Sequence, residues 1–101
     1  MDMEGWREKI DVLDGILVDL LNRRAGYALE IGKIKKEEGM PVYSPGRERQ
    51  ILERVQELNV GPLTSGAIKR LFERVIDESR RLEREMSERE DRGSAIDQGD
   101  T

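Results

Sequence analysis

The stretch that decides the fold is WREKIDVLDGILVDLLNRRAGYALEIGKIK, residues 6–35. It contains no proline, and its apolar residues recur three and four positions apart, as on one face of an α-helix. Those residues are Trp6, Ile10, Leu13, Leu17, Leu20, Leu21, Ala28 and Ile31. The pattern predicts one long helix from about Asp2 or Glu4 to about Glu38, with Gly39 as its stop signal.

Two basic residues interrupt this apolar stripe. Arg24 lies at its centre, and Lys35 ends it. A buried cation without a partner charge costs several kcal/mol, so the helix is expected to hold something negative. Two structural alternatives stay open: Arg24 forms a core ion pair, or Lys35 extends its ammonium to solvent from a helix end.

The rest of the chain predicts two more helices. Ser44-Pro45 is a cap and first-turn signal for a helix spanning about Pro45 to Leu58, and residues 59–62 form a turn. Thr64 can cap a third helix from about Ser65 to Glu88 or slightly beyond. Residues 1–86 then form one helical domain. Residues 87–101 are polar with almost no apolar anchor, and we expect a frayed or disordered tail there.

Composition excludes several classes of function. At 101 residues the chain is one small domain, and 22 acids against 18 bases give a net charge of −4, so a general basic surface for nucleic acid is absent. The absence of cysteine and histidine excludes disulfides, thiol nucleophiles, His-based triads and the usual zinc ligands. No signal-peptide core or membrane-length apolar run is present. We therefore expect a cytoplasmic chain that uses no metal and no cofactor.

The predicted helices do not suffice to cover one another. Helices of about 34, 14 and 24 residues leave the first one with unburied length. It also carries apolar residues off the main stripe, namely Val12, Ile16, Val18, Leu29 and Ile34. An all-α homodimer, in which three-helix chains intertwine about a two-fold axis, buries these faces most economically.

Further polar residues fall on inner faces. In the second helix, Arg47 and Glu48 precede the apolar Ile51 and Leu52 by four positions. In the third, Ser79 and Glu83 lie on the apolar side. Arg7 lies at the edge of the apolar stripe of the first helix. Each of these residues alone has an ordinary structural explanation. Glu48 or Glu83 can pair with Arg24 or Lys35, Ser79 can bond its own backbone, and Arg7 can be solvated. Together, three or four cations and two acids balance only if about two negative charges come from a ligand.

Four stretches carry a family resemblance. They are WREKIDVLD (6–14), LLNRRAGYALEIGKIK (20–35), PVYSPGRER (41–49) and IKRLFERVIDES (68–79). In this combination, from about Trp6 to Glu83, the chain resembles the all-helical class of chorismate mutases. The resemblance implies an intertwined homodimer with two active sites. It also implies the rearrangement of chorismate to prephenate, at the branch toward phenylalanine and tyrosine.

The resemblance also implies catalytic roles. Arg7 would enter the partner chain's site and bind a substrate carboxylate, whereas Arg24 would hold a carboxylate within its own chain. Lys35 would bond a carboxylate and the ether oxygen whose bond breaks. Glu83 stands where bacterial members usually have Gln beside that oxygen, and a Glu there must be protonated to donate a hydrogen bond.

The remaining implied contacts orient the substrate. Arg47 would steady the carboxylate-binding end with Ser79, and Glu48 would accept a hydrogen bond from the ring hydroxyl. Ser44 stands where an Asp often helps to bind that hydroxyl, so this contact would run through the backbone or through Ser44's own hydroxyl.

Three other functions remain open from the sequence. The isochorismate pyruvate-lyase reaction uses the same scaffold, and a shared scaffold does not fix the chemistry. A non-catalytic helical dimer that docks on a shikimate-pathway enzyme is a second alternative. A generic helical adaptor, with the charges as structural bridges, is the third; it would bind no dianion.

Overall fold

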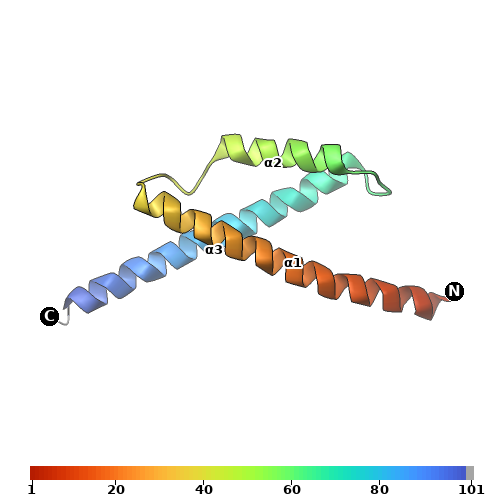
Figure 1. The fold of residues 1–101 in the computed structure, drawn as a ribbon, viewed down its shortest axis with the longest axis horizontal. Coiled ribbons are helices and arrows are strands. Elements are labelled where there is room, and N and C mark those ends of the chain that lie inside the picture. The colour runs from red at the N-terminus through yellow and green to blue at the C-terminus, as the bar shows by residue number, and fades with distance from the viewer. Residues whose placement is uncertain (100–101) are drawn as a thin grey trace.

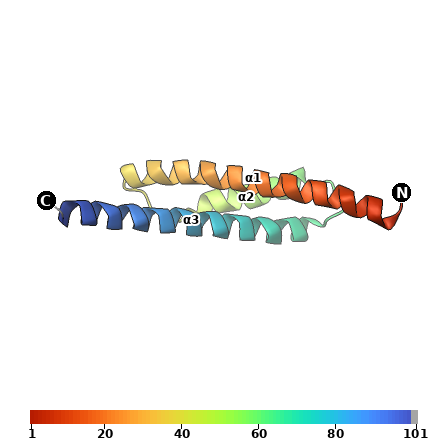
Figure 2. The ribbon, with the colours of Figure 1, turned by 90° about the horizontal axis from the view of Figure 1, so that it is seen from below.

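A computed structural model describes residues 1–99, with side chains described through residue 93. It contains three helices, α1 (Met3–Glu37), α2 (Pro45–Leu58) and α3 (Ser65–Gly99), and no strand within the described residues (Figures 1 and 2). The all-α fold class predicted from the sequence is confirmed, as are the expected bounds of the first two helices.

The ends of α1 follow from local chemistry. The Gly5 amide donates to Asp2 Oδ1 at 2.8 Å, so Asp2 caps the first turn. After Glu37 the chain turns at Gly39, whose φ of 69° favours a residue without a Cβ. Lys35 and Lys36 lie in the last turn, where positive charge complements the helix dipole.

The capping residues expected for α2 and α3 differ in whether their side chains form a capping hydrogen bond. Thr64 Oγ1 accepts from the Ala67 amide at 3.1 Å, which confirms the cap of α3. Ser44 occupies the N-cap position of α2 and Pro45 its first turn, as expected, but the Ser44 hydroxyl makes no capping hydrogen bond. Pro45 provides no backbone N–H in this first turn, and Ser44 lines a cavity.

The three helices do not form a closed bundle. The C-terminal half of α1 packs against the middle of α3, and α2 packs against the N-terminal half of α3 (Figure 1). The N-terminal half of α1 projects away from both (Figures 1 and 2). The radius of gyration is 18.3 Å, against about 13 Å for a compact domain of this length.

A single chain consequently buries very little apolar surface. Ile76, at 8% exposure, is the one buried hydrophobic residue among those whose side chains are described. The apolar stripe of α1 remains at least 47% exposed at the following positions: Trp6, Ile10, Leu13, Leu17, Leu20, Leu21 and Ile31. An exposed apolar stripe of this length is typical of a surface that another chain or element covers.

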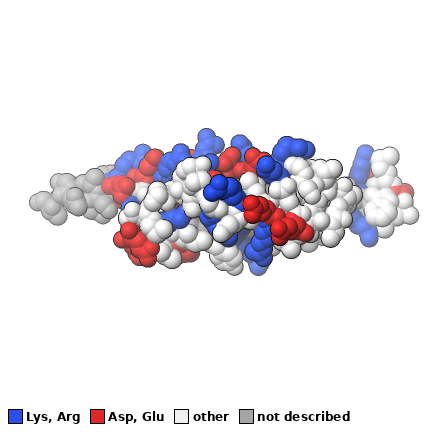
Figure 3. Space-filling model, turned by 90° about the horizontal axis from the view of Figure 1, so that it is seen from above, with Lys and Arg blue, Asp and Glu red and all other residues white. Residues whose placement is uncertain are grey.

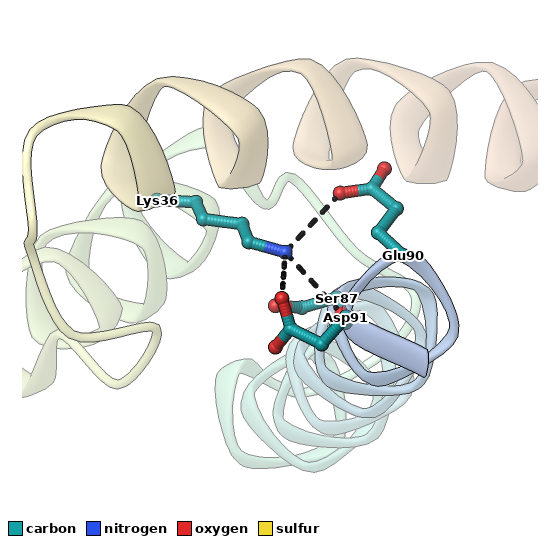
Figure 4. Close-up of polar contacts among 4 residues, drawn as sticks. All are labelled: Lys36, Ser87, Glu90 and Asp91. Carbon is teal, nitrogen blue, oxygen red and sulfur yellow. Dashed lines mark hydrogen bonds and ion pairs between the residues drawn. The ribbon is translucent and has the colours of Figure 1, made fainter. Parts of the chain in front are cut away.

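The third helix continues beyond its expected end near Glu88, as far as Gly99. No proline follows Pro62, and the Lys36 ammonium ties α3 to the end of α1 (Figure 4). Its Nζ lies 2.7 Å from Asp91 Oδ1, 3.5 Å from Glu90 Oε2 and 3.3 Å from the Ser87 carbonyl oxygen. Expecting the helix to end soon after Glu88 overlooked this contact. Residues 100–101 of the expected tail lie outside the described residues.

The surface is charged but not uniformly basic. Acidic and basic side chains are intermixed on the face seen in Figure 3. Within the described part of the chain, no helix combines the length and the apolar character needed to cross a membrane.

Candidate active site

One cavity of about 260 Å³ collects seven of the eight residues singled out from the sequence. It lies between the C-terminal half of α1, the start of α2, the connector before α2 and the middle of α3. The seven residues are Arg24, Lys35, Ser44, Arg47, Glu48, Ser79 and Glu83. Apolar side chains, including Ile31, Val42, Ile51 and Ile76, complete its lining.

Helical spacing places the side chains that α1 contributes to the cavity on one face of that helix. Arg24, Ile31 and Lys35 are separated by seven and four positions, so they share one face of the helix. Arg24 Nη1 donates to Ser79 Oγ at 3.4 Å, and Ser79 is itself buried. The possible ion pairs of Arg24 or Lys35 with an acid are not formed among the described side chains. Both cations are therefore available to an anionic ligand.

Lys35 is held over the cavity by the connector. Its Nζ donates to the Val42 carbonyl oxygen at 3.0 Å, and its side chain is half-buried. An ammonium has three donors, so two remain after this contact. The connector thus fixes the position of the charge without neutralising it.

Glu83 is the unusual acid of the site. Its Oε2 is buried and has no hydrogen-bond partner among the described residues. Burial raises the pKa of the Glu83 carboxyl above its ordinary value, and the neighbouring Lys35 ammonium opposes part of that rise. An acid in this environment holds its proton to a higher pH than an exposed one, so it can serve as a hydrogen-bond donor.

Gly32 allows α1 to approach Glu83 closely. A Cβ built at this position would lie 3.3 Å from Glu83 Cγ and 3.4 Å from Oε2. The glycine thus has a positional role in a helix that its presence otherwise weakens.

Arg80 is a cavity residue that the sequence interpretation missed. It lies four positions after Ile76 and three before Glu83, so one face of α3 presents all three residues. Ile76 is the buried apolar residue of α3 among the described side chains, so its face is the one that lines the cavity. Following the face that starts at Ile76 would have found Arg80.

Glu48 has a different partner from the one considered. Arg80 Nη1 lies 2.8 Å from Glu48 Oε1, whereas the sequence suggested Arg24 or Lys35 as the counter-ion. Arg47, beside it, lines the cavity but is exposed in the single chain.

Arg7 is the one predicted residue that does not join the cavity. It is exposed on the projecting half of α1, about 25 Å along the helix from Arg24. Within one chain it has no route to the site. Among the described side chains, no group of three or more acidic residues is arranged to hold a metal ion.

Comparison with known proteins identifies the family. Residues 6–84 match the family model described as chorismate mutase type II. The chain belongs to this chorismate mutase family. The resemblance seen in the sequence is therefore confirmed over the stretch that carries the cavity.

Solved chorismate mutases share the fold. The form II structure of the Thermus thermophilus enzyme superposes with a TM-score of 0.80 at 30% identity, over 81% of this chain and 93% of that one. The chorismate mutase of Helicobacter pylori, solved in complex with prephenate, gives a TM-score of 0.76 at 35% identity, over 82% and 90% of the two chains.

Longer relatives contain a similar segment. The bifunctional chorismate mutase/prephenate dehydratase of Neisseria gonorrhoeae is 41% identical over 81 residues, which is 80% of this chain and 22% of the relative. The chain spans between a fifth and a quarter of the length of the first curated relatives that it matches.

Proposed function

We propose that the chain is a chorismate mutase, an isomerase that rearranges chorismate to prephenate in the synthesis of phenylalanine and tyrosine. The observation that carries the proposal is the cavity itself. It combines three cations that have no acidic partner among the described side chains, Arg24, Lys35 and Arg47, with the buried carboxyl of Glu83. The prephenate bound to the Helicobacter pylori relative supports the same class of ligand.

The reaction fits the chemistry that these residues offer. The rearrangement is an intramolecular pericyclic shift of a dianion, so it requires no nucleophile and no proton transfer. An enzyme accelerates it by selecting the compact conformer in which the reacting carbons approach each other. It also stabilises the negative charge that grows on the ether oxygen as the C–O bond lengthens.

The residues divide between these two tasks. Arg24 and Arg47 would bind the carboxylates, because a planar guanidinium matches a carboxylate with two parallel hydrogen bonds. Ser79 orients Arg24 through the contact at 3.4 Å. Lys35 and protonated Glu83 would stabilise the ether oxygen, and Glu48 with Ser44 would bind the ring hydroxyl.

The first test is turnover of chorismate by the purified protein. We expect the absorbance of chorismate to fall as prephenate forms. Prephenate is recognised because it is acid-labile. No turnover of chorismate would contradict the proposal. Isochorismate would then be tested as the substrate of a lyase, and ligand-induced thermal stabilisation would separate a binding module from an adaptor that binds no dianion.

The proposal includes an intertwined homodimer in which Arg7 completes the partner chain's site. Two observations support this: Arg7 is remote from its own cavity, and the apolar stripe of α1 is exposed in the single chain. A second copy of α1 along that stripe would bury it and carry Arg7 toward the other cavity. A cytoplasmic location and a shikimate-pathway partner enzyme remain predictions of the sequence.

Mixed dimers test the role of Arg7. Arg7→Ala and Lys35→Met chains should each have low activity alone. Unfolded and refolded together, they should recover about a quarter of the unmodified activity, because half of the dimers are mixed and each mixed dimer holds one intact site. Assays before and after co-refolding measure the recovery. Co-refolding of Arg24→Ala with Lys35→Met is the control, since both residues belong to one chain's cavity and no intact site forms. Equal recovery in the two mixtures would contradict the exchange of Arg7.

A further inference from the structure

Arg80 is restrained by three contacts at the mouth of the cavity. Its Nη1 lies 2.8 Å from Glu48 Oε1, and its Nη2 lies 2.8 Å from Asp77 Oδ1. The face of the guanidinium covers Tyr43, with the central carbon 4.8 Å from the ring centre. These partners come from α2, α3 and the connector, so Arg80 joins all three segments.

The Arg80–Glu48 pair differs from the other ion pairs on the surface. The two side chains are 24% and 23% exposed, whereas each of the other ion pairs with described side chains has at least one partner that is 47% exposed or more. Shielding from water strengthens a charge-assisted hydrogen bond, and stacking on Tyr43 fixes the plane of the guanidinium. The position of the Glu48 carboxylate is thereby determined.

A fixed Glu48 whose charge is offset matters in a site for a dianion. An unpaired carboxylate there would repel the two carboxylates of the substrate. Arg80 offsets this charge through Oε1, and it leaves Oε2 free of this contact to accept a hydrogen bond. Its second acidic partner, Asp77, is 56% exposed, so water screens that carboxylate more than it screens Glu48. The contact thus offers an acceptor for a hydroxyl while Arg80 reduces the negative charge that Glu48 presents to the substrate.

We propose that Arg80 is a positioning residue that holds Glu48 for the ring hydroxyl of the substrate and offsets its charge. The inference rests on the proposed function, because it assigns Glu48 to that hydroxyl. Arg80 is not among the site residues expected from the sequence. By holding Glu48, it favours the binding of a dianion that carries a ring hydroxyl.

The test compares steady-state constants of Arg80→Met with those of the unmodified protein. Methionine keeps an apolar stem over Tyr43 but removes the charge and the hydrogen bonds. We expect KM for chorismate to rise about tenfold while kcat changes less than about threefold, since substrate binding is what is lost. Arg80→Lys restores the charge without the planar fork, and its KM should lie between the two.

Arg81→Met is the matched control. Arg81 is the next residue of α3, is 69% exposed, and pairs only with Glu78 and Glu85 of its own helix among the described residues. Its KM should equal that of the unmodified protein. Thermal melting of each variant shows whether it is folded, and Arg80→Lys serves as the test if Arg80→Met does not fold.

A double-mutant cycle with Glu48→Gln separates positioning from a general structural role. If Arg80 acts through the Glu48 carboxylate, Arg80→Met should change KM less than about twofold in the Glu48→Gln background. An unchanged KM in Arg80→Met, or an undiminished effect in that background, would overturn the inference while the enzyme remains a mutase. Absence of turnover in the unmodified protein would instead overturn the proposed function, so the two failures are distinct.

Discussion

Replacement of Lys35 by methionine is expected to lower kcat by about 10³-fold. The Lys35 ammonium is half-buried over the cavity, and in the proposed reaction it faces the ether oxygen as negative charge develops there. Removing one group that stabilises such charge typically costs between about 10² and 10³ in kcat. We expect the upper end because the lost group is a full charge on a half-buried side chain.

The methionine variant isolates the charge from the packing. Its unbranched side chain can occupy the space of the lysine stem, so the fold should persist. Steady-state kinetics with chorismate measure the effect, and circular dichroism with thermal melting monitors the fold. A loss in kcat of less than about tenfold in a folded variant would contradict the role given to Lys35.

Lys33→Met is the matched control for Lys35. Lys33 lies two positions earlier on α1, is 57% exposed, and pairs with Glu30 on its own helix at 3.1 Å. Both substitutions remove one positive charge from nearly the same place in the chain. Nearly unchanged kinetics in Lys33→Met would show that the loss at Lys35 comes from its place in the cavity.

Much of the fold was accessible from the sequence because its signals are local. Asp2 and Gly39 delimit α1, Pro45 begins α2, and Thr64 caps α3, each through contacts within a few residues. The continuation of α3 past Glu88 was not predicted, because the Lys36 contact with Asp91 joins residues more than 50 positions apart in the sequence. Contacts at that separation leave no periodic pattern.

The same distinction applies to the site. Arg24 and Lys35 were found because a charge stands out on an apolar face, and Glu48 because its position relative to Ile51 and Leu52 could be read from helical spacing. Arg80 was missed because the crossing of α3 with α1 decides which face of α3 is buried. The pairing of Glu48 with Arg80 also depends on how the helices pack, as does the lack of a hydrogen-bond partner for Glu83 Oε2 among the described residues.

Activity is expected to fall as pH rises through the pKa of Glu83. Only the protonated carboxyl can donate a hydrogen bond to the ether oxygen, and the ionised form would repel the developing charge. Burial raises this pKa above its ordinary value, against the opposing effect of Lys35. The active, protonated form is therefore present below the raised pKa and is lost above it, with kcat/KM falling about tenfold per pH unit.

Two substitutions distinguish this dependence from other causes. Glu83→Gln should give a flat profile between about pH 5 and 9, because an amide donates a hydrogen bond at any of these pH values. Glu83→Ala should have about 10²- to 10³-fold lower kcat/KM than Glu83→Gln across the whole range, since no donor remains. Profiles of kcat/KM for the three proteins, measured in one buffer series of constant ionic strength, make the comparison.

The pH profile of the unmodified protein is the first test of whether activity requires a proton on Glu83. A profile that is already flat from about pH 5 to 8 would contradict the requirement for a proton on Glu83. A slope that persists in Glu83→Gln would assign the titration to another group. If the slope vanishes in both variants while only Glu83→Gln keeps high activity, the buried oxygen without a partner among the described residues is the donor that the ether oxygen requires. The pH range of activity in this chain would then follow from one packing contact, the approach of Gly32 on α1 to Glu83 on α3.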